Sequence, residues 1–215
     1  MKHYVITLLD HPKSVRAAER CIKSAAKYGI EVEKWEATTP HNVQQLMDEN
    51  KINHRLFNDS MYSREDNARA AFMSHFRLWK HCVDTKQEIT VFEHDAVVVA
   101  PIPNMMYNGF ISLGKPSYGF YKTPPILGVN KLTSKQYLPG AHAYRLKPKA
   151  AQIIIDEARM EATPTDMFLN IKRFPFIQEY YPWPVECIDD FTTIQKDYGC
   201  VMKHGYDENY KIEEV

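Results

Sequence analysis

The sequence lacks the features that mark several large protein classes. Its four cysteines are scattered, so neither a zinc site of paired cysteines nor a compact disulfide framework is expected. It contains neither Gly-x-Gly-x-x-Gly nor the full P-loop motif Gly-x-x-x-x-Gly-Lys-Ser/Thr, which argues against dinucleotide oxidoreductases and P-loop nucleotidases. Phosphate binding is therefore expected to depend on a metal. Buried free thiols are expected at Cys21, Cys82, Cys187 and Cys200.

Net charge and long apolar runs are also missing. Lys+Arg and Asp+Glu both total 27 in 215 residues, so the chain as a whole has no positive field that would attract nucleic acid or an anionic membrane. No stretch approaches the length of a membrane span, and the apolar run at residues 4–9 is too short for a signal peptide. We expect a cytoplasmic protein with one domain over residues 1–215, because a hydrophobic content of 44% can build an adequate core.

Apolar strands and amphipathic helices alternate along the chain. Residues 3–9 are rich in β-formers, an Asx-type cap at Asp10 with Pro12 favours a helix from there to Gly29, and residues 30–37 alternate like a second strand. Further helices are expected at 40–50, 63–83, 149–160 and 165–171, and further strands at 88–92, 110–113, 141–146 and 185–188. This order predicts an α/β fold with a mostly parallel sheet between helices, whose ligands bind at the carboxyl ends of the strands.

Two carboxylates occupy such a strand end. Glu93 and Asp95 follow the buried strand at 88–92, and in an extended backbone they point to the same side while His94 points away. Mg²⁺ or Mn²⁺ held by one or two carboxylates keeps room for phosphate oxygens and water. The triplet therefore predicts a metal site for a nucleotide diphosphate, although such triplets also occur in many solvated turns.

Three blocks of the sequence resemble glycosyltransferase family 25, the lipopolysaccharide and collagen galactosyltransferase group, and they occur in that family's order. The first block, residues 67–80, contains Ser74-His75 and a following Leu-Trp. The second is Glu93-His94-Asp95, where the family usually has Glu-Asp-Asp, and the third is the Gly-x-x-Ala-Tyr segment ending at Tyr144. Weaker similarity covers the N-terminal strand with Asp10 and Arg16, and residues 191–195, where Thr192 replaces a common Ser.

The resemblance implies a GT-A-like fold, a UDP-sugar donor, dependence on Mn²⁺ and inversion at the anomeric carbon. It implies that Glu93 and Asp95 bind the metal. It also implies donor contacts from Asp10, Arg16, Ser74, His75 and Gln195. A satisfied core histidine would explain His75 as well, and a helix cap with surface charge would explain Asp10 and Arg16.

Asp166 is the candidate general base, because the resembled family places an Asp at this position. The role requires a carboxylate within hydrogen-bond reach of the acceptor hydroxyl, whose proton it takes. Asp189 and Asp190 are alternative bases. Residues 163–166 also read as a helix start, where an acidic side chain favours the amide end of the helix.

The middle of the chain is rich in loops. Seven of the 13 prolines and five of the eight glycines lie between Pro101 and Pro148, which leaves room for a substrate lid. Its aromatic and proline residues suit an acceptor wall, or packing beneath a loop: Tyr118, Phe120, Tyr121, Pro124 and Pro125.

Two further features of this region are given structural roles. Tyr144 is interpreted as a core residue rather than a stacking platform. Arg145, Lys147 and Lys149 alternate, and this predicts one solvated strand edge rather than a DNA site.

The leading hypothesis is an inverting, metal-assisted hexosyltransferase that moves galactose or glucose from a UDP-sugar to a hydroxyl of a glycan or other acceptor. A metal-dependent nucleotidyltransferase also uses strand-end carboxylates, but it ordinarily adds a basic or Gly-rich loop for phosphate, which the sequence lacks. A third hypothesis is a non-catalytic module that binds a nucleotide sugar or glycan and whose metal site is degenerate at His94. The sequence gives no clear sign of a nucleic-acid partner and leaves the sugar and the acceptor open.

Overall fold

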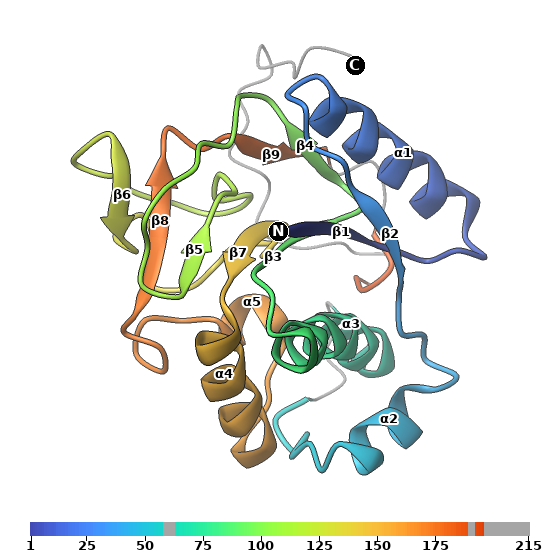
Figure 1. The fold of residues 1–215 in the computed structure, drawn as a ribbon. Coiled ribbons are helices and arrows are strands. Elements are labelled where there is room, and N and C mark those ends of the chain that lie inside the picture. The colour runs from blue at the N-terminus through green and yellow to red at the C-terminus, as the bar shows by residue number, and fades with distance from the viewer. Residues whose placement is uncertain (58–62, 189–191, 196–215) are drawn as a thin grey trace.

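The structure is a computed structural model that describes residues 1–57, 63–188 and 192–195 (Figure 1). Its strands are β1 (Lys2–Thr7), β2 (Glu33–Glu36), β3 (Ile89–Glu93), β4 (Ala96–Val98), β5 (Phe110–Ser112), β6 (Gly128–Lys131), β7 (Ala143–Leu146), β8 (Ile177–Tyr181) and β9 (Val185–Cys187). Its helices are α1 (Pro12–Ala26), α2 (Val43–Glu49), α3 (Glu65–Thr85), α4 (Pro148–Met160) and α5 (Thr165–Phe168).

Seven of these strands form one sheet in the order β2-β1-β3-β7-β5-β8-β6. β7 runs antiparallel to β3 and β5, and β6 runs antiparallel to β8, whereas the other five strands share one direction. The predicted α/β fold with a mostly parallel sheet between helices is confirmed. β4 and β9 form a separate antiparallel pair.

Helices cover both faces of the large sheet (Figure 1). The helix α1 lies on one face with the β4–β9 pair, and α2, α3, α4 and α5 lie on the other. Each strand serves both layers because successive side chains point to opposite faces. In β1, for example, Tyr4 and Ile6 join the core beneath α3, whereas Val5 between them joins the core beneath α1.

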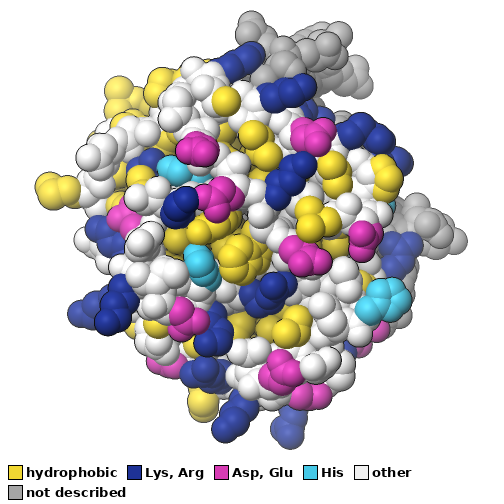
Figure 2. Space-filling model, turned by 45° about the vertical axis from the view of Figure 1, so that its right-hand side comes forward, with side chains coloured by type: hydrophobic (Ala, Val, Ile, Leu, Met, Phe, Trp, Pro, Cys, Tyr) yellow, Lys and Arg dark blue, Asp and Glu magenta, His cyan; other side chains and the backbone are white. Residues whose placement is uncertain are grey.

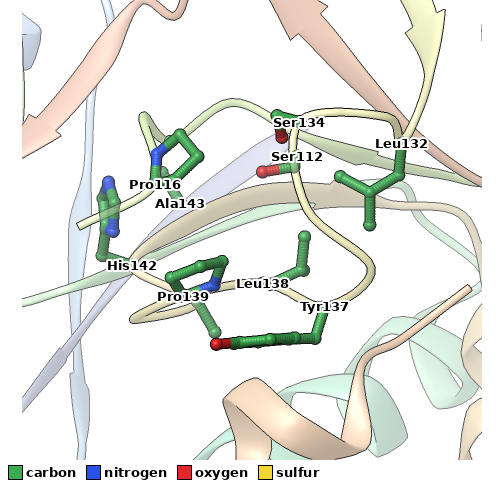
Figure 3. A pocket seen from close by; sticks show the side chains of 11 residues that line it. Ser112, Pro116, Leu132, Ser134, Tyr137, Leu138, Pro139, His142 and Ala143 are labelled. Atoms are coloured by element: carbon green, nitrogen blue, oxygen red, sulfur yellow. The ribbon is translucent and has the colours of Figure 1, made fainter. Parts of the chain in front are cut away.

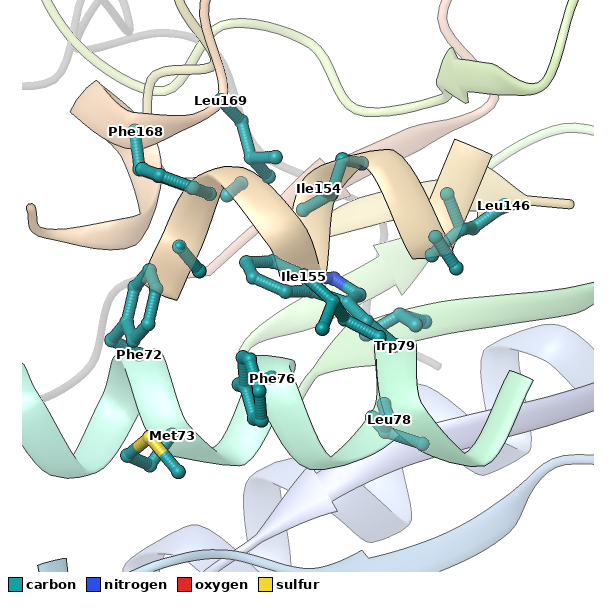
Figure 4. Close-up of a cluster of buried hydrophobic side chains, with 14 of the residues drawn as sticks. Phe72, Met73, Phe76, Leu78, Trp79, Leu146, Ile154, Ile155, Phe168 and Leu169 are labelled. Atoms are coloured by element: carbon teal, nitrogen blue, oxygen red, sulfur yellow. The ribbon is translucent and has the colours of Figure 1, made fainter. Parts of the chain in front are cut away.

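The larger core is built on aromatic residues of α3. Phe72, Phe76 and Trp79 are fully buried and recur at helical spacing, so they form one apolar stripe that faces α4 and Phe168 (Figure 4). The ring of Phe72 meets those of Trp79 and Phe168 edge-on, with centroids 5.5 and 5.2 Å apart. This packing fixes the position of α3 against α4 and α5.

Three short strands were not predicted. β4, β6 and β8 have three, four and five residues, and periodicity over so few residues does not by itself distinguish a strand from a loop. β8 also lies between Pro175 and Pro182, and prolines argue against a strand. Its Glu179 is buried and accepts hydrogen bonds from the backbone N–H groups of Thr133 and Ser134, so it ties this strand to the neighbouring loop.

Two of the local predictions that are wrong concern α1 and β7. His11 rather than Asp10 caps α1, and its Nδ1 accepts a hydrogen bond from the backbone N–H of Ser14 at 3.4 Å. Arg145 does not mark a solvated strand edge with Lys147 and Lys149, because β7 lies inside the sheet between β3 and β5. The Arg145 side chain is buried and donates to the backbone oxygen of Pro103.

Three of the predicted buried thiols are confirmed. Cys21, Cys82 and Cys187 are free and buried, and Cys200 lies outside the described residues. In the parts of the chain that the structure describes, no helix combines the length and apolar character needed to cross a membrane. The limits of the single predicted domain, residues 1–215, stay a prediction.

Replacing Phe72 with Ala is expected to lower the free energy of unfolding by about 3–5 kcal/mol, because it opens a cavity among fully packed rings. Urea unfolding followed by circular dichroism measures the change. Ile153→Ala is the matched control, since that side chain is 45% exposed on α4 and its loss should change stability by about 0.5 kcal/mol or less. Equal losses in the two variants would contradict the assignment of the core to this stripe.

Candidate functional site

Two adjoining cavities lie at the carboxyl ends of β1, β2 and β3. One has a volume of about 340 Å³ and the other about 110 Å³. Both are lined by Ala71, Glu93, His94, Thr193 and Ile194, so they meet beside Glu93. The smaller cavity extends between the ends of β1 and β2 and the side of α3, and the larger one extends toward β7 and α5. This is the strand end at which the sequence predicted a ligand.

Glu93, the last residue of β3, is held by a buried chain of hydrogen bonds. His75 of α3 is 1% exposed, and its Nε2 lies 2.9 Å from Glu93 Oε1. Its other ring nitrogen, Nδ1, lies 2.9 Å from the hydroxyl of Tyr144 in β7. The indole N–H of Trp79 donates to that same hydroxyl at 2.8 Å. Two strands and one helix thus fix the position of a single carboxylate.

The direction of each bond in this chain follows from its first member. The indole nitrogen of Trp79 can only donate, so the hydroxyl oxygen of Tyr144 accepts from it and its proton is directed to Nδ1 of His75. Nε2 of His75 then carries the ring proton and donates it to Glu93. Burial lowers the pKa of His75 to about 3, in agreement with a neutral ring at pH 7. A neutral donor orients the Glu93 carboxylate without cancelling its charge.

His94 and Asp95 form the turn between β3 and β4, so the predicted extended backbone through Asp95 is wrong. All three residues of the triplet line the larger cavity. The Nδ1 of His94 lies 3.2 Å from the hydroxyl of Ser14, which itself accepts from the backbone N–H of Leu8 at 2.9 Å. His94 therefore anchors the turn to the start of α1.

Asp166 approaches the larger cavity from the opposite side, at the first turn of α5. Tyr118 donates a short hydrogen bond to Asp166 Oδ2, and the backbone N–H of Met167 donates to Oδ1 at 2.9 Å. Burial raises the pKa of Asp166, and the bond from Tyr118 opposes that rise. Lys135 holds Tyr118 in turn, because its Nζ donates to the Tyr118 backbone oxygen at 2.8 Å and lies 5.2 Å from the ring centroid.

His142 is a site residue that sequence reasoning did not single out. It is 2% exposed, lines the larger cavity, and also borders a small cavity of about 10 Å³ with Ser112 and Ser134 (Figure 3). A Cβ atom at Gly114 would lie 2.5 Å from its Nε2, so only glycine at that position leaves room for the ring. Only the spatial contact reveals this dependence, because the two residues are far apart in the sequence.

The remaining predicted residues fall into three groups. Ser74 and His75 line the smaller cavity, and Gln195 lines the larger one. Asp10 and Arg16 are exposed and are not among the described lining residues of either cavity. Asp189 and Asp190 lie outside the described residues.

The predicted acceptor wall is only partly at the site. Tyr118 lines the larger cavity, Phe120 is 99% exposed, and Tyr121 packs against Trp183 with ring centroids 5.6 Å apart. Tyr144 is fully buried, which agrees with the core role predicted for it, and it also orients His75.

Comparisons with known proteins find a matching family model for the first part of the chain. The family model described as glycosyltransferase family 25 (LPS biosynthesis protein) matches residues 1–107, which include His75, Glu93 and Asp95. No curated protein sequence matches the chain. Among solved structures, a mutant Drosophila β1,4-galactosyltransferase 7 in complex with manganese, UDP-Gal and xylobiose is similar at 8% identity and a TM-score of 0.46, covering 96% of this chain and 71% of that one. Residues 1–107, just under half of the chain, are thus similar to glycosyltransferase family 25.

Proposed function

We propose that this chain is a glycosyltransferase of the kind found in family 25, which moves a hexose, galactose or glucose, from a UDP-sugar to a hydroxyl of a glycan or other acceptor, with inversion at the anomeric carbon. The observation that carries the proposal is the meeting of Glu93, Asp95 and Asp166 on one cavity of about 340 Å³. Glu93 and Asp95 come from one strand end and its turn, Asp166 comes from a distant part of the chain, and the cavity joins a second, smaller one. A donor and an acceptor can therefore lie side by side.

The donor diphosphate belongs beside Glu93 and Asp95. Three carboxylates around one cavity repel an anionic diphosphate, so a cation is required between them. The oxygen ligands of Glu93 and Asp95 fit a hard ion such as Mn²⁺ or Mg²⁺, which would neutralise the negative charge that develops on the leaving UDP. Within the described ranges no group of three or more His, Cys, Asp or Glu residues could hold a metal, so phosphate oxygens and water would complete this site.

The nucleoside belongs in the smaller cavity. Its lining combines apolar side chains from the ends of β1 and β2, such as Ile6 and Ala37, with the polar residues Thr38 and Ser74. The Ser74 hydroxyl accepts from the backbone N–H of Thr38 at 2.9 Å and donates to the backbone oxygen of Ala70 at 2.8 Å, so it fixes the wall of the cavity. In this proposal Asp10 and Arg16 contact the donor from the exposed rim.

Asp166 takes the proton from the acceptor hydroxyl. The acceptor oxygen then forms a bond to the anomeric carbon as the bond from that carbon to the UDP oxygen breaks on the opposite face of the sugar. Attack from the face opposite the leaving group inverts the anomeric centre. The raised pKa of Asp166 suits this role, because a carboxylate of higher pKa is a stronger base.

UDP is expected to bind in the presence of Mn²⁺ and not in the presence of a chelator, and Asp95→Asn should abolish this metal-dependent binding. The reason is that the variant loses one of the two charged oxygen ligands proposed for the cation. Isothermal titration calorimetry with UDP, and with GDP and dTDP for base selectivity, measures the effect. Asp84→Asn is the matched control, because Asp84 pairs with Lys80 on an exposed part of α3. Parent-like UDP affinity in Asp95→Asn would exclude Asp95 as a ligand.

Asp166→Asn is expected to lower kcat by roughly 10²–10⁴-fold while leaving metal-dependent UDP binding intact, because the amide keeps the size of the side chain but cannot take the proton. UDP release from UDP-galactose or UDP-glucose in the presence of acceptor glycans gives the rate. A normal kcat in this variant would remove Asp166 from the reaction. Release of pyrophosphate instead of UDP would identify a nucleotidyltransferase, and donor binding without any turnover would identify a binding module.

Tyr118→Phe is expected to shift the acid limb of the pH profile of kcat to higher pH. The hydrogen bond from Tyr118 stabilises the charged form of Asp166, so its removal raises the pKa of the base and activity is lost first at low pH. At high pH, where Asp166 is ionised in both proteins, kcat should be similar. An unshifted acid limb would show that the titration of Asp166 does not control the rate.

A further inference from the structure

The neutral total charge hides a strong asymmetry along the chain. Residues 96–155 contain seven Lys and Arg residues and no Asp or Glu, so the acidic residues lie entirely in the rest of the chain. The face shown in Figure 2, by contrast, carries Lys, Arg, Asp and Glu side chains interspersed with one another. The acid-free segment includes β5, β6, β7 and the connection between β5 and β6.

That connection exposes large apolar side chains. Phe120 is 99% exposed, Leu127 is 76% exposed and Ile126 is 60% exposed, all within eight residues. A single exposed apolar side chain is ordinary, but several gathered on one exposed segment mark a candidate contact surface. Two lysines are exposed nearby: Lys122 lies between Phe120 and Ile126, and Lys131 follows at the end of β6. Apolar and positively charged side chains therefore alternate along this part of the chain.

The connection is held to the body of the protein. The hydroxyl of Ser117 donates to the backbone oxygen of Pro139 at 3.1 Å, and the backbone N–H of Lys122 donates to the backbone oxygen of Ser134 at 2.9 Å. The ring of Tyr121 packs against Trp183. These contacts hold the backbone of the connection against the rest of the protein, while its exposed side chains extend into solvent.

We propose that the β5–β6 connection docks on the surface of an anionic lipid bilayer, with Phe120, Ile126 and Leu127 entering the headgroup region and Lys122 and Lys131 pairing with lipid phosphates. Projecting apolar tips suit a soft interface into which they can sink. Lysine is depleted in protein–protein interfaces but strengthens binding to anionic lipid, which favours a membrane over a protein partner. This inference does not depend on the proposed sugar transfer.

The test is sedimentation of the full chain with vesicles of phosphatidylcholine alone or mixed with phosphatidylglycerol in equal parts. We expect binding to the mixed vesicles, little binding to phosphatidylcholine alone, and weaker binding as salt is raised. Lys122→Ala combined with Lys131→Ala should weaken binding to mixed vesicles by roughly fivefold for each lysine. Phe120→Ser combined with Leu127→Ser should weaken it at least as much. Met160→Ser is the matched control, because Met160 is 72% exposed at the end of α4 and should bind like the parent.

Two results would overturn the proposal. One is the absence of parent binding to the mixed vesicles at low salt. The other is parent-like vesicle binding by both double variants. If the Phe120 and Leu127 substitutions then reduce self-association in analytical ultracentrifugation, the apolar residues form a contact between proteins instead. Unfolding curves of the variants confirm that the substitutions leave the fold intact, as expected for exposed side chains.

Discussion

The site depends on the hydrogen-bond chain that runs from Trp79 through Tyr144 and His75 to Glu93. Its first three members are buried, so leaving any of their polar atoms without a partner would cost free energy. The chain is therefore satisfied in only one order, with the proton of His75 on the nitrogen that faces Glu93. The same residues that build the aromatic core of α3 and the centre of the sheet also set the orientation of a carboxylate at the cavity.

The rest of the site is assembled around this fixed point. The turn at His94 and Asp95 continues from Glu93 and is attached to α1 through Ser14. Asp166 reaches the cavity from α5, where Tyr118 orients it, and His142 fills the space that Gly114 leaves open. In the proposed reaction, Glu93 and Asp95 hold the cation that binds the donor, and Asp166 takes the proton of the acceptor. These two groups face one another across one cavity.

The sequence indicated much of the fold, because the uninterrupted apolar run of β3 and the helical spacing of apolar residues in α1 are strong, local signals. It also placed Glu93 and Asp95 at a strand end, and it identified Asp166 as a candidate. It could not show that His75 joins Tyr144 to Glu93, that His11 rather than Asp10 caps α1, or that Arg145 lies inside the sheet. Those outcomes depend on contacts between segments far apart in the chain and on the strand order β3-β7-β5, which local patterns do not encode.

The most direct test of a metal-bound donor beside Glu93 uses the paramagnetism of Mn²⁺ and NMR of the histidine side chains. When Mn²⁺ and UDP are added together, the imidazole signals of His75 and His94 should broaden strongly. Nε2 of His75 lies 2.9 Å from Oε1 of the proposed ligand Glu93, and His94 stands between the proposed ligands Glu93 and Asp95 in the sequence. The signal of His54, which is not among the described lining residues of either cavity, should broaden much less. Equal broadening of the three signals, or no broadening of His75 and His94, would contradict the account.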